Sequence, residues 1–169
     1  VGTAIYGMKN TQSVSLEMMK AHGKAVCSNT KKSFTIVDMP YGTYKNKNLA
    51  LKNAKEIINY TRCDSVKLEI DERNIHIVKH LTRNNINVVS HIGVTPQKYS
   101  NFNEIKAFRK KLKEEKQIIS LAKKLEEANS FLIVLECIYS NIAKKITDLL
   151  SIPTIGIGSS SHCDGQVLV

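Results

Sequence analysis

Five short apolar segments without polar alternation constrain the fold more than any other feature of this sequence. Each is rich in Val, Ile, Leu or Phe and closes on a polar group or a glycine; they are residues 34–38 (FTIVD), 65–69 (SVKLE), 88–91 (VVSH), 131–136 (FLIVLE) and 154–158 (TIGIG). Strands of this composition are buried on both faces, as parallel sheets and barrels require and half-solvated antiparallel sheets do not. The sequence therefore predicts a parallel β-sheet.

Segments with helical periodicity separate these strands. Apolar residues recur on one helical face in residues 47–60 and 71–84, and helical segments at 104–129 and 143–150 precede the fourth and fifth strands. Alternation of buried strands with helices predicts right-handed βαβ units around a parallel sheet. A nucleotide-binding open sheet would carry a glycine-rich turn after its first strand, which this sequence lacks. Polar residues at the ends of several strands instead favour an α/β barrel of the TIM type.

Five strands are fewer than the eight that close such a barrel. The sequence begins at Val1 without an initiator methionine and ends in the apolar run GQVLV, which resembles the start of another element. We therefore expect residues 1–169 to form a single partial barrel domain, an internal fragment that holds about five of the eight strands.

Composition excludes several classes of protein. A hydrophobic content of 42% and a charged content of 24% are typical of globular domains and exclude disorder. The net charge is +10, but the lysines alternate with glutamates in helical segments, which predicts a solvated outer face and no nucleic-acid partner. No segment is apolar for long enough to span a bilayer, and the four scattered cysteines predict free thiols, so we expect a cytoplasmic protein without a membrane partner.

The candidate site begins with two carboxylates at successive strand ends. Asp38 and Glu69 would point into one pocket mouth, where paired carboxylates form a hard-oxygen site suited to Mg²⁺. Lys67 lies two residues before Glu69, so alternation along the strand places both side chains on the same face. A lysine beside a metal site would supply positive charge for an anionic substrate such as an α-keto acid.

Glu136 closes the fourth strand and would be partly desolvated, an environment that suits a carboxylate for proton transfer. A metal and Lys67 would together stabilise the enolate formed when a proton leaves the carbon next to a ketone. His91, at the end of the third strand, is placed to orient a loop or a ligand.

Structural roles remain open for each of these residues. Asp38 precedes Met39 and Pro40 and could only cap a loop, a strand lysine can be merely paired, and a buried glutamate can serve a structural network. His76 and His80 have the i, i+4 spacing of metal ligands, but without a third ligand they indicate a solvated helix face.

Longer motifs in the same segments resemble a known family. Residues 37–44 (VDMPYGTY), 66–69 (VKLE), 91–97 (HIGVTPQ), 134–137 (VLEC), 152–158 (IPTIGIG) and 163–169 (CDGQVLV) resemble, in this order, the 3-methyl-2-oxobutanoate (ketopantoate) hydroxymethyltransferase family. Residues 7–22 resemble the family's segment after its second strand. The resemblance covers essentially the whole sequence.

The resemblance implies a (β/α)8 barrel of the phosphoenolpyruvate/pyruvate type that assembles into homo-oligomers. It implies transfer of a hydroxymethyl group from 5,10-methylenetetrahydrofolate to 3-methyl-2-oxobutanoate, giving 2-dehydropantoate in pantothenate biosynthesis through a Mg²⁺-stabilised enolate. The implied roles are metal ligand and substrate contact for Asp38, metal ligand for Glu69, substrate contact for Lys67 and catalytic proton acceptor for Glu136.

The sequence departs from the family pattern at several positions. The family's first metal ligand and a substrate-binding serine lie in a Gly-Asp-Ser motif that would fall just before Val1. Ile70 and Asp71 stand where the family usually has two glycines and could crowd the loop over the pocket. Residues 103–109 replace a glycine-rich loop, and Ser159 replaces an alanine or glycine. Two alternatives therefore stay open: a divergent non-catalytic relative, and a sister enzyme that makes another enolate.

Overall fold

The computed structural model describes residues 1–100 and 112–168 of the chain. Two helices come first, and strands then alternate with helices. The elements are α1 (Gly2–Tyr6), α2 (Leu16–Asn29), β1 (Ile36–Asp38), α3 (Lys47–Thr61), β2 (Ser65–Glu69), α4 (Ile75–Thr82), β3 (Val88–Gly93), the 3₁₀ turn η1 (Pro96–Lys98), α5 (Leu112–Glu127), β4 (Leu132–Glu136), α6 (Ser140–Leu149), β5 (Thr154–Ile157) and β6 (Gly165–Gln166). No helix in the described ranges is long and apolar enough to cross a membrane.

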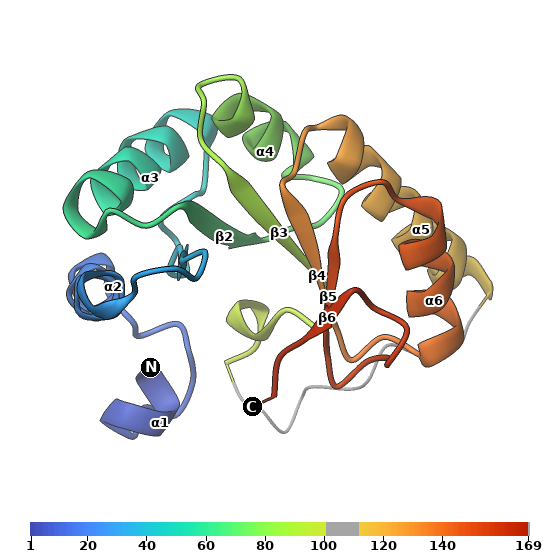
Figure 1. The fold of residues 1–169 in the computed structure, drawn as a ribbon, viewed down its shortest axis with the longest axis horizontal. Coiled ribbons are helices and arrows are strands. Elements are labelled where there is room, and N and C mark those ends of the chain that lie inside the picture. The colour runs from blue at the N-terminus through green and yellow to red at the C-terminus, as the bar shows by residue number, and fades with distance from the viewer. Residues whose placement is uncertain (101–111, 169) are drawn as a thin grey trace.

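The strands form one parallel sheet in the order of the sequence, β1-β2-β3-β4-β5-β6. Every neighbouring pair is parallel, and helices α2 to α6 form an arc around one side of the sheet (Figure 1). Helical crossovers between adjacent parallel strands are the βαβ units that the alternating pattern predicts. All five predicted strands are present, and the run GQVLV contributes a sixth, β6.

The sheet is strongly curved. Phe34, just before β1, and Phe131, just before β4, stack with ring centroids 4.7 Å apart and an interplanar angle of 9°. In a flat sheet these two strands would lie three spacings apart, about 14 Å. Curvature of this kind gives the sheet a concave face and a convex face, as in part of a barrel.

The two faces of the sheet are packed differently. The convex face meets the helices in a large buried cluster that includes Leu68, Ile92 and Leu135. The concave face carries a smaller cluster around Val89 and Val134. Burial on both faces explains why the strands lack the alternation of a half-solvated sheet.

The helix predicted at 47–60 is observed with nearly the same bounds, and the other three predicted helices differ or are described only in part. The segment predicted at 71–84 becomes helical only at Ile75, because the Asn74 side chain accepts a hydrogen bond from the Asp71 amide and closes a turn before the helix. The last helix starts three residues earlier than predicted, at Ser140. The described part of α5 runs from Leu112 to Glu127. The first part of the predicted segment 104–129 and the segment 103–109, which was expected to replace a glycine-rich loop, lie outside the described residues.

Candidate active site

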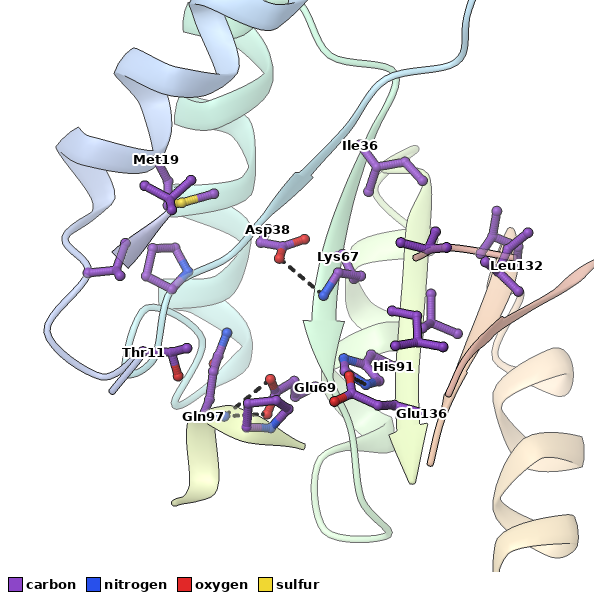
Figure 2. A pocket seen from close by; sticks show the side chains of 18 of the residues that line it. Thr11, Met19, Ile36, Asp38, Lys67, Glu69, His91, Gln97, Leu132 and Glu136 are labelled. Carbon is purple, nitrogen blue, oxygen red and sulfur yellow. Dashed lines mark hydrogen bonds and ion pairs between the residues drawn. The ribbon is translucent and has the colours of Figure 1, made fainter. Parts of the chain in front are cut away.

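The carboxyl ends of the first four strands meet at one concave site. Asp38, Lys67, Glu69, His91 and Glu136 all line a cavity of about 840 Å³, and Figure 2 shows their side chains turned toward it. The sheet register brings them together, because Asp38 lies beside Lys67, Glu69 beside His91, and Glu136 beside Gly93. The predicted gathering of Asp38, Lys67, Glu69 and Glu136 in one pocket is therefore observed.

Asp38 and Lys67 form an ion pair across β1 and β2. Lys67 Nζ lies 3.2 Å from Asp38 Oδ2, and the lysine side chain is 19% exposed. The alternative in which Asp38 caps the following loop is not supported by any hydrogen bond among the described residues. Both side chains face the cavity. The Lys67 ammonium group can bind an anionic ligand there, and the Asp38 carboxylate can bind a cation.

Glu69 is the most buried carboxylate of the site, with 6% of its surface exposed. Both of its oxygens accept the backbone N–H of Gln97, at 3.2 Å for Oε1 and 3.0 Å for Oε2. Burial raises the pKa of Glu69 to about 7, the charges of Glu136 and Asp38 act in the same direction, and Lys67 and the Gln97 amide oppose the rise. A positive ion is the natural partner for such a carboxylate.

Gln97 joins four segments around Glu69, a function that the sequence did not reveal. Its side-chain oxygen accepts the Tyr44 hydroxyl at 2.6 Å, and its side-chain nitrogen donates to the Met39 carbonyl at 2.9 Å. Its own carbonyl accepts the Gln12 side chain at 3.0 Å. The HIGVTPQ motif thus ends in a residue that ties the β1–α3 loop and the N-terminal segment to the wall of the cavity.

His91 lies beside Glu136 at the centre of the site (Figure 2). Its Nε2 lies 3.0 Å from Glu136 Oε2, although neither ring nitrogen makes a well-aligned hydrogen bond within the described ranges. Burial lowers the pKa of His91, and Lys67 adds to this effect, against the opposing influence of Glu136. An imidazole at 2% exposure therefore faces one oxygen of Glu136, and its lowered pKa favours the neutral form.

The backbone around Glu136 is unusually constrained. Gly93 has φ +98°, which allows β3 to pass so close to β4 that the Val94 amide donates to the Glu136 carbonyl at 3.0 Å. Cys137, directly after Glu136, also has a positive φ of 52°, which is uncommon for a residue with a side chain. Strained backbone of this kind concentrates at functional sites, because the surrounding structure must hold it in place.

The residues present fit Mg²⁺. The donors are two carboxylates on adjacent strand ends, Asp38 and Glu69, and Mg²⁺ is commonly held by one or two carboxylates together with water and substrate oxygens. No group of three His, Cys, Asp or Glu side chains capable of holding a metal occurs among the described residues. A metal at this site would therefore take its remaining oxygens from solvent and ligand.

The side chains of Ile70, Asp71 and Ser159, which the sequence suggested as departures from the resembled pattern, do not line the cavity. Ile70 is buried at 2% exposure, and Asp71 forms ion pairs in the β2–α4 loop. Ser159 donates its hydroxyl to the Ile138 carbonyl at 2.8 Å and so links two loops. On α4, His76 is exposed and His80 is half-buried with its Nε2 enclosed, so the expected solvated face holds for His76 alone.

Comparison with known proteins identifies the family. The family model described as ketopantoate hydroxymethyltransferase matches residues 1–169. The chain belongs to the ketopantoate hydroxymethyltransferase family. Similar curated proteins of this family are the 3-methyl-2-oxobutanoate hydroxymethyltransferases of Pelagibacter ubique (48% identity, 100% of this chain, 65% of the relative), Aliarcobacter butzleri (45%, 96%, 61%) and Helicobacter pylori strain 26695 (43%, 98%, 62%).

A solved structure supports the same architecture. The crystal structure of 2,3-dimethylmalate lyase, a PEP mutase/isocitrate lyase superfamily member, matches with a TM-score of 0.60 at 15% identity, over 91% of this chain and 54% of that chain. At this identity the likeness shows the fold, a parallel sheet of the barrel type. The chain spans 61–65% of the length of the ketopantoate hydroxymethyltransferases named above.

Proposed function

We propose that the intact protein transfers a hydroxymethyl group from 5,10-methylenetetrahydrofolate to 3-methyl-2-oxobutanoate, giving 2-dehydropantoate for pantothenate biosynthesis. The observation that carries this proposal is the convergence of Asp38, Lys67, Glu69 and Glu136 on one cavity in a chain of this family. Two carboxylates, a lysine and a separate glutamate together meet the needs of enolate chemistry on a keto acid.

Glu136 is the proton acceptor in this proposal. Its Oε2 faces neutral His91, which leaves Oε1 to take the proton from C3 of the keto acid. The C3–H bond breaks, and its electron pair forms the enolate. C3 then bonds to the one-carbon unit of the folate and water supplies its hydroxyl, while both bonds from that carbon to the folate nitrogens break. The proton from C3 and one proton from water end on these nitrogens, and tetrahydrofolate leaves. His91 acts here as a positioning residue that fixes the orientation of the glutamate.

Asp38, Glu69 and Lys67 prepare the keto acid for this proton transfer. When bound, Mg²⁺ would stabilise negative charge on the keto oxygen as a Lewis acid, and Asp38 and Glu69 are the side chains that would hold it. Lys67 Nζ, already 3.2 Å from Asp38, attracts the anionic substrate into the cavity. Val134 and Ile157 add an apolar surface to the same cavity, which the branched carbon chain of the keto acid can contact.

Hydrogen exchange tests the proposal without the folate. The intact protein is incubated with 3-methyl-2-oxobutanoate and Mg²⁺ in D₂O, and loss of the C3 proton is followed by ¹H NMR. We expect Mg²⁺-dependent exchange; a folded protein that shows none would support a non-catalytic relative. Addition of 5,10-methylenetetrahydrofolate should then yield 2-dehydropantoate, and exchange without that product would point to a sister enzyme making another enolate.

The proposal also covers the domain organisation, localisation, oligomeric state and partners of the protein. We place residues 1–169 in one partial barrel domain, in the cytoplasm and in a homo-oligomer, with the keto acid and folate as ligands and with no nucleic-acid or membrane partner. A reducing compartment agrees with the free thiols of Cys27, Cys63, Cys137 and Cys163. Light scattering of the purified intact protein would give the oligomer size.

A further inference from the structure

We infer that Asp71 is a positioning residue that, through Lys98, holds the η1 turn and its Gln97 amide against Glu69. The inference rests on the proposed function only where Glu69 is taken as a metal ligand. Asp71 does not line the cavity that holds Asp38, Lys67, Glu69 and Glu136. It acts on the site through the η1 turn.

Asp71 is the centre of a compact set of interactions in the β2–α4 loop. Its Oδ1 accepts the Arg73 amide at 2.9 Å, and its Oδ2 accepts Arg73 Nη2 at 2.7 Å. Asn74 Oδ1 accepts the Asp71 amide at 2.7 Å, and Asn74 Nδ2 donates to the Glu69 carbonyl at 3.3 Å. The carboxylate is therefore fixed in a turn that begins directly at the end of β2.

One ion pair connects this turn to the loop after β3. Lys98 Nζ lies 3.0 Å from Asp71 Oδ2, and the two side chains are 42% and 25% exposed. Lys98 closes the η1 turn, with its amide donating to the Thr95 carbonyl at 3.0 Å. The preceding residue is Gln97, whose amide donates to both oxygens of Glu69. The Asp71–Lys98 ion pair is thus linked to Glu69 through the Gln97 amide, although Asp71 and Lys98 lie outside the cavity.

The Asp71–Lys98 ion pair holds the η1 turn from one side, and hydrogen bonds to Gln97 hold it from the other. Tyr44, Met39 and Gln12 hold Gln97 from the β1–α3 loop and the N-terminal segment. Without Lys98, the turn would keep these bonds and the two bonds from the Gln97 amide to Glu69, but it would lose its ion pair to the β2–α4 loop. The Asp71–Lys98 ion pair is therefore an additional restraint on the η1 turn from the β2–α4 loop.

Two variants remove the Asp71–Lys98 ion pair; Asp71→Asn also removes the pair with Arg73, whereas Lys98→Met leaves that pair in place. Asn at position 71 can still accept the Arg73 amide, so Asp71→Asn removes the charge and keeps the turn. Lys98→Met keeps most of the apolar stem and removes the ammonium group. The matched control is Glu72→Gln, because Glu72 is the neighbouring residue and its ion pair, 2.9 Å to Lys124 on α5, does not reach η1.

The intact protein is examined by hydrogen exchange of the Gln97 amide, by Mn²⁺ binding followed by electron paramagnetic resonance, and by urea unfolding. We expect Asp71→Asn and Lys98→Met each to lower Gln97 protection and weaken Mn²⁺ binding about threefold, a size typical of an exposed pair. The double variant should lose no more than either single one. Raising NaCl to about 0.5 M should shrink the difference from wild type by screening.

Equal protection and Mn²⁺ affinity in wild type and both variants would overturn the inference. So would an equal loss in Glu72→Gln, because a general loosening of the loop would then explain the effect. If wild-type protein binds no Mn²⁺, the metal site of the proposed function fails, while Gln97 protection still decides whether Asp71 positions the turn. Urea unfolding separates either result from loss of the whole fold.

Discussion

Among the glycines in the described part of the chain, Gly93 leaves the least room for a side chain. A Cβ atom there would lie 2.2 Å from the Glu136 carbonyl oxygen and 2.9 Å from Ile138 Cγ1, and φ is +98°. We expect Gly93→Ala to lower the free energy of unfolding by about 2–5 kcal/mol, from backbone strain and overpacking together. Urea unfolding of the purified variant measures this loss.

Gly7 offers the matched control for that substitution. Its φ is also positive, at +61°, but an added Cβ would meet no atom within 4 Å. Gly7→Ala should therefore cost only the backbone strain, about 1–2 kcal/mol. Equal losses at the two positions would mean that contact with Glu136 does not constrain Gly93.

Glu136 and Asp38 should separate by role when each is replaced. Glu136→Gln keeps the shape beside His91 and removes the proton acceptor, so deuterium exchange at C3 should fall at least about 100-fold while Mg²⁺ and keto acid binding stay nearly intact. Asp38→Ala should weaken both Mg²⁺ and keto acid binding, because it removes an oxygen donor and the partner of Lys67. Isothermal titration and ¹H NMR measure the two effects, and an unchanged exchange rate in Glu136→Gln would rule out this base.

The proposed site residues were predictable one by one, but their supports were not. Alternation along β2 fixes Lys67 and Glu69 on one face, and a strand-end position fixes Asp38 and Glu136. Gln97 acts through its backbone amide and through bonds to Tyr44 and Met39, segments more than fifty residues away. Such contacts depend on how loops fold back, which strand periodicity does not encode.

At the scale of elements, Asp64 links the beginnings of β1 and β2. Its carboxylate accepts the Thr35 amide and the Thr35 hydroxyl, each at 2.7 Å. The backbone and then the side chain of Thr35 lower the pKa of Asp64 below its ordinary value of 3.8. A lowered folded-state pKa contributes stability above the ordinary carboxyl range, and that stability is lost as the pH falls through the folded-state pKa.

Asp64→Ala should therefore destabilise the protein most at neutral pH and progressively less as the solution is acidified below pH 4. Urea unfolding of wild type and variant across the acidic range measures the difference. Thr35→Val, which keeps the amide donor and removes the hydroxyl, should show a smaller effect of the same sign. A difference between Asp64→Ala and wild type that does not change with pH would contradict this role.

Strands were easier to predict than helix starts for a physical reason. The apolar run 65–69 coincides with β2, because burial on both faces leaves the sequence no alternative pattern. Residues 71–74 fit the helical period, yet Asp71 and Asn74 hydrogen bond locally and delay α4. Asp and Asn side chains compete with helical hydrogen bonds in this way, so periodicity alone sets the helix start too early.

At the scale of the whole molecule, sheet curvature is what assembles the site. The carboxylates on β1, β2 and β4 reach the same cavity only because the strands curl, as the Phe34–Phe131 stack at the opposite end of β1 and β4 also shows. The alternation of strands and helices predicted a barrel-type sheet, but composition could not give the degree of curvature. That depends on how helices α2 to α6 pack against the convex face (Figure 1).

Metal binding should consequently stabilise the whole fold. Asp38 and Glu69 lie on different strands and come together only in the folded chain, so Mg²⁺ that binds both will favour the folded state. At a Mg²⁺ concentration 100-fold above Kd, the free energy of unfolding should rise by about 2.7 kcal/mol, and EDTA should reverse the gain. Urea unfolding at constant ionic strength, with Na⁺ as the matched salt, measures the shift. Asp38→Asn should lose most of it; an equal gain in that variant would place the ion elsewhere on the protein.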